Sequence, residues 1–145
     1  MEFRILGPLE VEAQGTPVML GPAKQRSLLG ILLLHANEVV ARERLVDELW
    51  GDRPPATATK LVQVYVSQLR RVLDANGGGD VLRTRAPGYL VAVSDDELDA
   101  GRFKSLVARA RAQAQAGAME RAAATYQDAL ALWRGTVLAD LAFES

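Results

Sequence analysis

The sequence predicts an α+β fold, a winged helix-turn-helix with a three-stranded N-terminal sheet followed by all-α helices of the tetratricopeptide (TPR) type. Short alternating segments fill the first twenty residues, three helical segments and a β-hairpin pattern continue to about residue 93, and two alanine-rich helical segments follow. Helix, turn, helix and hairpin is the order of elements in a winged helix. We therefore expect one unit at residues 1–93 and a second at residues 94–145.

The first twenty residues predict three short strands. Apolar side chains alternate with polar neighbours at four positions, Phe3, Ile5, Leu9 and Val11. Gly7-Pro8 interrupts this alternation, and residues 14–17 have the composition of a turn. The third strand is expected immediately after that turn, at Val18–Leu20.

Three helices and a hairpin are expected next. The first helix runs from Gly21-Pro22 to Ala36 and is apolar around most of its circumference, which predicts a central core helix. The second helix spans Arg42–Trp50, and the third runs from Ala56 to Asp74 before a run of glycines. Alternating segments at Val81–Thr84 and Tyr89–Val93 then predict a hairpin around a Pro-Gly turn.

The remaining residues predict two helices, Asp99–Ala116 and Met119–Arg134, which are separated at Gly117. Their apolar stripes are Phe103, Leu106, Val107 and Ala110 in the first helix, and Ala122, Tyr126, Ala129, Leu130 and Trp133 in the second. This pattern matches one TPR, and about three repeats are needed for a stable stack. Either the helices pack on the first unit or the chain is a piece of a longer protein. We expect a longer protein, because Leu138–Leu141 has the pattern of another helix start.

Composition excludes several classes of protein. The 145 residues include no cysteine, so disulfides and thiolate metal sites are excluded. The longest apolar run, Leu28–Leu34, is too short to span a bilayer, and no signal-peptide pattern is present. We therefore expect a cytoplasmic protein with no membrane partner. The net charge is −1, yet residues 53–91 carry six basic and two acidic side chains, which favours an anionic partner for this segment.

The third predicted helix has an outward face suited to DNA. At 100° per residue the inward side comprises Val62, Tyr65, Val66, Leu69 and Leu73. The opposite side carries Lys60, Val64, Ser67 and Arg71, flanked by Gln63, Gln68 and Arg70. No acidic residue lies between Thr59 and Arg71 to repel phosphates. Such side chains can reach bases or phosphates in a major groove, where Val64 suits a thymine methyl group. The alternative is an ordinary solvated basic face.

The hairpin and the first helix supply further candidates for DNA contact. Arg83 and Arg85 project to the same face of one strand, and Arg85 at the tip of a wing can enter a minor groove. Alternatively, this pair keeps a strand edge soluble. Tyr89 is expected to pack its ring on the domain, with its hydroxyl available to a phosphate. Lys24 and Arg26 lie beside free N–H groups at a helix start, where phosphate contact and plain solvation are the two alternatives.

Three segments resemble the OmpR/PhoB-type winged helix, namely Trp50-Gly51, KLVQVYVSQLRRVL at residues 60–73 and RTRAPGY at residues 83–89. Within that group the chain resembles the Streptomyces antibiotic regulatory protein (SARP) family, also through FRILGPLE at residues 3–10 and ALALWRG at residues 129–135. This family joins the winged helix to a bacterial transcriptional activation domain of TPR-like helices. The resemblance covers essentially the whole chain.

The resemblance implies that residues 60–71 belong to the recognition helix and that Arg83 and Arg85 lie on the wing. It implies an activator of antibiotic biosynthetic genes, located in the bacterial cytoplasm at the nucleoid. The family binds direct repeats of double-stranded DNA at promoters as side-by-side protomers and recruits the RNA polymerase holoenzyme. Many members of the broader group carry two arginines where Ser67-Gln68 stand here, so their base preference does not transfer.

An enzyme is not expected. The only histidine, His35, ends the first predicted helix, and the acidic residues at 95–99 suit helix capping better than metal binding. No catalytic residue, metal site or cofactor is predicted. The alternative function is a protein-interaction module whose winged helix does not bind DNA specifically, and it would lack the steep salt dependence of a DNA-binding protein.

Overall fold

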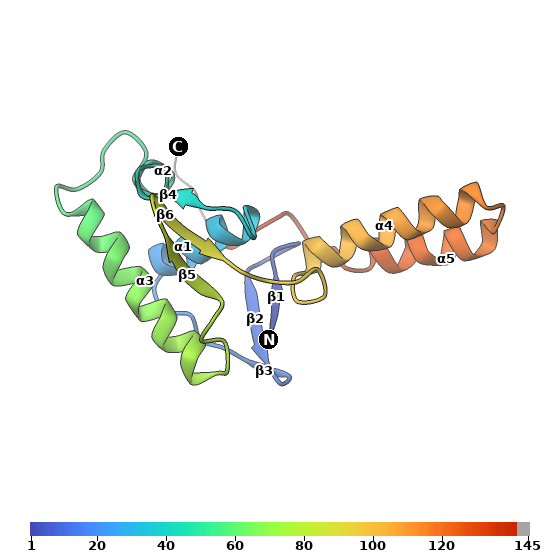
Figure 1. Cartoon of the computed structure of the whole chain (residues 1–145), viewed down its shortest axis with the longest axis horizontal. Coiled ribbons are helices and arrows are strands. Elements are labelled where there is room, and N and C mark those ends of the chain that lie inside the picture. The colour runs from blue at the N-terminus through green and yellow to red at the C-terminus, as the bar shows by residue number, and fades with distance from the viewer. Residues whose placement is uncertain (142–145) are drawn as a thin grey trace.

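A three-stranded antiparallel sheet begins the chain in the computed structural model, which describes residues 1–141 (Figure 1). Its strands are β1 (Glu2–Arg4), β2 (Glu10–Ala13) and β3 (Thr16–Pro17), in the order β1-β2-β3. The predicted position of the third strand at residues 18–20 is wrong. Gln14 and Gly15 have φ values of 52° and 78°, so the chain reverses within two residues and pairs with β2 at once.

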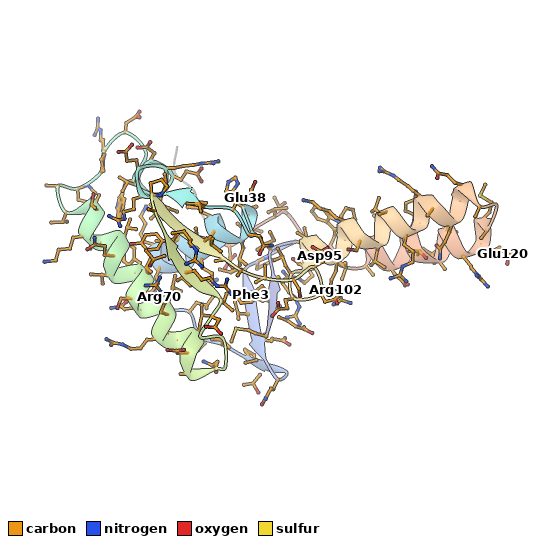
Figure 2. The ribbon with its side chains drawn as sticks, in the orientation of Figure 1. Phe3, Glu38, Arg70, Asp95, Arg102 and Glu120 are labelled. Atoms are coloured by element: carbon orange, nitrogen blue, oxygen red, sulfur yellow. The ribbon has the colours of Figure 1, made fainter. Side chains whose placement is uncertain are left out.

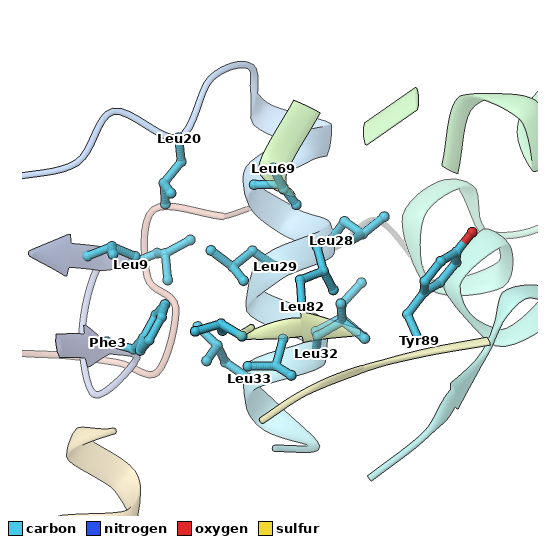
Figure 3. Packing of buried hydrophobic residues seen from close by; sticks show 14 of the residues in the cluster. Phe3, Leu9, Leu20, Leu28, Leu29, Leu32, Leu33, Leu69, Leu82 and Tyr89 are labelled. Atoms are coloured by element: carbon cyan, nitrogen blue, oxygen red, sulfur yellow. The ribbon is translucent and has the colours of Figure 1, made fainter. Parts of the chain in front are cut away.

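The three predicted helices are confirmed, with some ends displaced by two residues. They are α1 (Ala23–Leu34), α2 (Arg42–Trp50) and α3 (Ala58–Ala75). α1 lies at the centre of the core, and its buried apolar side chains are Leu28, Leu29, Ile31, Leu32 and Leu33 (Figure 3). Side chains from both sheets and from α3 pack around it, including Phe3, Leu9, Leu69 and Leu82. The core therefore joins the N-terminal strands to the helix-turn-helix.

The predicted hairpin is part of a second three-stranded sheet. Its strands are β4 (Val40–Ala41), β5 (Leu82–Arg85) and β6 (Gly88–Val91), in the order β4-β6-β5. β4 was not predicted, because two residues without alternation give no strand signal. The strand forms because Val40 and Ala41 pair with Tyr89 and Gly88 across the sheet.

Gly88 is required by the close approach of β4. A Cβ atom at this position would lie 1.9 Å from the Val40 carbonyl oxygen, so Gly88→Ala is expected to separate β4 from β6. The cost should be at least the roughly 1–3 kcal/mol typical of an overpacked core. Chemical denaturation measures this loss of unfolding free energy. Gly135→Ala is the matched control, because a Cβ there meets nothing within 4 Å, and equal stabilities of the two variants would contradict the prediction.

Two antiparallel helices, α4 (Asp99–Gln115) and α5 (Met119–Leu130), project away from the rest of the molecule (Figure 1). The predicted stripe of α5 is partly wrong. Ala122 and Ala129 are buried, but Leu130 is 65% exposed and Tyr126 is also exposed. Thr125 is buried instead, and its hydroxyl bonds to the Gln113 side chain on α4 and to a backbone carbonyl one turn earlier. Each helix of the described chain is too short or too polar to cross a membrane.

The segment after α5 returns to the winged helix. α5 ends at Leu130, before the predicted Arg134, and the backbone amides of Arg134 and Leu138 donate to the carbonyls of Leu6 and Ile5. Leu138 is buried against Gly30 of α1, which leaves the space that this side chain needs. Residues 137–140 form a turn, and because any helix after residue 141 would lie outside the described residues, the entry to another helix stays a prediction.

The connection between β1 and β2, residues 5–9, is the anchor for both ends of the α4–α5 hairpin. At its beginning, Asp99 is buried and its carboxylate accepts hydrogen bonds from the backbone amides of Ile5 and Leu6, at 2.9 Å each. The acidic residues at 95–99 were predicted to serve a helix N-terminus, and Asp99 does lie in the first turn of α4, where it also accepts the Ala100 amide at 2.8 Å. The N-cap itself is Leu98, without a side-chain cap bond. At the other end, the Asp140 carboxylate accepts the amide of Leu9 at 2.8 Å.

Candidate nucleic-acid interface

α3 is held on α1 and α2 by the inward side that the periodicity predicts. Val62, Val66, Leu69 and Leu73 are buried, and the half-buried ring of Tyr65 stacks on Trp50 of α2 with a centroid distance of 6.3 Å. Aromatic stacking and burial fix the rotation of α3 about its axis. The orientation of its outward face is therefore set by the core.

The outward face of α3 is exposed as predicted. Its exposed side chains are Lys60, Gln63, Val64, Ser67, Gln68 and Arg71. Val64 is 39% exposed although it is apolar, and it lies one turn from both Lys60 and Ser67. Among residues 1–141 neither Lys60 nor Arg71 forms an ion pair, so both positive charges are available to an anion outside the chain. Contact with DNA remains a prediction.

The two wing arginines are exposed on β5, next to the turn that joins it to β6. Each makes a local hydrogen bond to a backbone carbonyl: Arg83 Nε donates to Asp80 at 2.8 Å and Arg85 Nη1 to Thr84 at 3.0 Å. A carbonyl orients a guanidinium without neutralising it. Both arginines therefore present their charge on the wing.

Arg70 differs from its neighbours on α3. Its side chain is half-buried and is directed toward β5, where it donates to the Leu82 carbonyl and to the Thr84 hydroxyl (Figure 2). The sequence places Arg70 on the flank of the outward face but gives no sign of this contact.

Three other candidates have partners within the protein. The ring of Tyr89 is buried, in keeping with its predicted packing role, and the Arg42 guanidinium lies 5.9 Å from its centroid. Lys24 donates to the Leu49 carbonyl at the end of α2, and Arg26 pairs with Asp140. The two alternatives predicted for Lys24 and Arg26 were phosphate contact and solvation. Neither alternative included the contacts with Leu49 and Asp140.

Arg42 is an exposed cation that the sequence prediction omits. It begins α2, lies over Tyr89 and donates its backbone amide to the Pro87 carbonyl of the wing turn at 3.3 Å. The available signal was a basic residue at the start of the helix that precedes α3. Arg42 adds positive charge at the base of the wing.

The N-terminal sheet, in contrast, has an acidic surface. Arg4 is surrounded by Glu2, Glu10 and Glu12, with the Glu12 carboxylate 2.9 Å from its guanidinium. The hydrogen bond from Arg4 holds the pKa of Glu12 below its usual value. These carboxylates neutralise the only basic residue of the sheet, so this surface does not suit a phosphate backbone. Within residues 1–141, no group of three or more potential metal ligands is gathered.

A helix-turn-helix followed by a β-hairpin that packs beside it places the protein in the class of winged-helix proteins. Residues 15–91 match the family described as "Transcriptional regulatory protein, C terminal", and residues 98–145 match "Bacterial transcriptional activator domain". The chain belongs to the SARP family of transcriptional regulators, which joins these two domains.

Relatives with curated names agree with this assignment. MoaR1 of Mycobacterium tuberculosis and DnrI of Streptomyces peucetius are each 38% identical to this chain over 97% of its length. The match covers 46% of MoaR1 and 54% of DnrI, so the chain spans about half the length of these relatives. The structure of M. tuberculosis EmbR, in complex with a low-affinity phosphopeptide, has a TM-score of 0.93 at 38% identity, covering 97% of this chain and 38% of EmbR. The predicted α+β winged helix with a helical region is confirmed.

Proposed function

We propose that this chain is the DNA-reading part of a transcription activator and binds promoter DNA sequence-specifically through α3 and the wing. The observation that carries the proposal is the outward face of α3, where two cations without an ion-pair partner among residues 1–141, polar side chains and an exposed valine lie together without an acidic residue. Residues 1–93 form the DNA-binding unit, and residues 94–145 form the first part of the activation domain.

The chemistry of these side chains assigns a task to each group. Lys60 and Arg71 bind phosphates or guanine edges, the amides of Gln63 and Gln68 read adenine, and Val64 contacts a thymine methyl group. Ser67 supplies a short hydroxyl to either a base or a phosphate. Arg85 enters the minor groove beside the wing, where negative potential is concentrated, and Arg83 contacts the backbone next to it.

Membership of the SARP family supports the finer parts of the proposal. Two protomers lie side by side on direct repeats of double-stranded DNA at a promoter and recruit the RNA polymerase holoenzyme. The regulated genes belong to antibiotic or other secondary-metabolite biosynthesis, and the protein acts on the nucleoid in the bacterial cytoplasm.

The test is fluorescence-anisotropy binding to promoter fragments and random duplexes across a salt series. Specific sites should bind at least about 10³-fold more tightly than random duplexes at physiological salt. The logarithm of the affinity should fall linearly with the logarithm of the salt concentration, by about 0.9 for each phosphate contact. A tandem of two half-sites should bind two protomers cooperatively. Weak, unselective binding at every salt concentration would contradict the proposal. It would favour the alternative function, a protein-interaction module that does not bind DNA specifically.

A further inference from the structure

We propose that Arg70 is a positioning residue that holds the wing against the recognition helix, and is not itself a DNA contact. This inference rests on the proposed function, because it assigns one residue of the same interface a different task. Its basis is the contact that Arg70 makes between two consecutive elements, α3 and β5, across the loop that joins them.

The contact uses one edge of the Arg70 guanidinium, the edge formed by Nε and Nη2. Nε donates to the Leu82 carbonyl at 3.1 Å, and Nη2 donates to the Thr84 hydroxyl. A guanidinium is planar and its donors have a fixed geometry, so two simultaneous bonds define both the distance and the orientation of the acceptors. Arg70 thus determines where the middle of β5 lies relative to α3.

The Leu82 carbonyl is available because β5 is an edge strand of the β4-β6-β5 sheet. Ala92 donates to the Val81 carbonyl at 2.8 Å, which makes residues 81 and 92 a hydrogen-bonded pair. In an antiparallel ladder the next residue directs its own N–H and C=O groups away from the partner strand. The carbonyl of Leu82 therefore points to the open edge, where the Arg70 side chain replaces a neighbouring strand.

The second acceptor, Thr84, lies between the two wing arginines in the sequence. Successive side chains of a strand point to opposite faces. The bond to Thr84 therefore fixes which face of β5 is turned toward α3, and with it the direction in which Arg83 and Arg85 project. DNA with a regular groove geometry requires a constant spacing between major-groove and minor-groove contacts. Arg70 sets this spacing on the protein side.

The role of Arg70 can be separated from a direct phosphate contact by Thr84→Val, which removes the hydroxyl but no charge. In the absence of DNA, Arg70→Met and Thr84→Val are both expected to raise amide hydrogen exchange across residues 82–91. Arg71→Met is the matched comparison, because it removes an exposed charge from the next position of α3 and should leave this exchange unchanged. Thermal unfolding of each variant checks that the whole chain remains folded.

DNA binding gives the second readout. Arg70→Met and Thr84→Val should each weaken binding by about tenfold, similar to Arg85→Ala, and should have little further effect when combined with Arg85→Ala. Thr84→Val should also reduce the salt dependence of the DNA affinity, although it removes no charge. The reason is that Arg83 and Arg85 are then no longer held in position to contact phosphates.

Two results would overturn the inference: unchanged exchange in Arg70→Met, or full affinity in Thr84→Val together with additive losses for Arg70→Met and Arg85→Ala. The second result would identify Arg70 as a direct DNA contact. Should the unmodified chain bind no DNA specifically, the proposed function fails, while the exchange measurement still decides whether Arg70 holds the wing.

Discussion

Replacing both Lys60 and Arg71 with alanine is expected to weaken specific DNA binding by about 100-fold or more. Both side chains are exposed on the outward face of α3. Contacts of this kind contribute about 1–3 kcal/mol each when they read a base, and each phosphate contact adds about 0.9 to the salt slope. Fluorescence anisotropy over a salt series measures both quantities on the same samples.

The matched control is Arg109→Ala combined with Arg111→Ala, which removes the same charge from exposed positions of α4. This variant should bind DNA nearly as tightly as the unmodified chain. A loss on cognate and random duplexes alike would mark Lys60 and Arg71 as phosphate contacts, whereas a loss confined to the cognate duplex would mark them as readers of bases. An α3 variant that binds no worse than the α4 variant would refute the assignment of the recognition helix.

Leu138→Ala is expected to lower the free energy of unfolding by about 2–5 kcal/mol, the usual cost of removing a buried leucine side chain. Leu138 is 2% exposed and packs against Gly30 of α1, although it lies more than one hundred residues later in the chain. Urea denaturation followed by circular dichroism measures the change.

Leu130→Ala is the control for this prediction, because the same substitution is made at the 65% exposed end of α5. Its expected cost is within about 0.5 kcal/mol, as for most surface positions. If the two variants were equally stable, the segment after α5 would not contribute to the core, and the winged helix would be independent of it.

The helix-turn-helix and the outward face of α3 could be predicted from the sequence because their signals are local. The apolar period of α3 places Val62, Val66 and Leu69 inside, and the same geometry then leaves Lys60 and Val64 outside. The candidate site depends on this one rotation, and the rotation is encoded within eighteen residues of continuous helix.

Features that depend on distant partners could not be predicted. β4 exists only because Val40 and Ala41 meet β6, and the side chain of Arg70 is drawn to an open strand edge that no helical period reveals. The pattern at Leu138 does not reveal the buried turn that the structure has at residues 137–140, since a short apolar run has no unique period. Tertiary contacts with Ile5 and Gly30 hold this turn in place.

The N-terminal strands also define how such proteins can be recombined. The family match to the DNA-binding domain begins at residue 15, after β1 and β2, yet the connection between these strands carries the backbone groups that bind Asp99, Arg134 and Asp140. In a chimaera that exchanges DNA specificity between two regulators, residues 1–13 must therefore match both partners: α1 through Phe3 and Val11 in the core, and the helical hairpin through the backbone of residues 5–9. A single junction after the wing, near residue 93, would move residues 1–13 together with the winged helix. The α4–α5 hairpin would then lose the backbone groups that hold it.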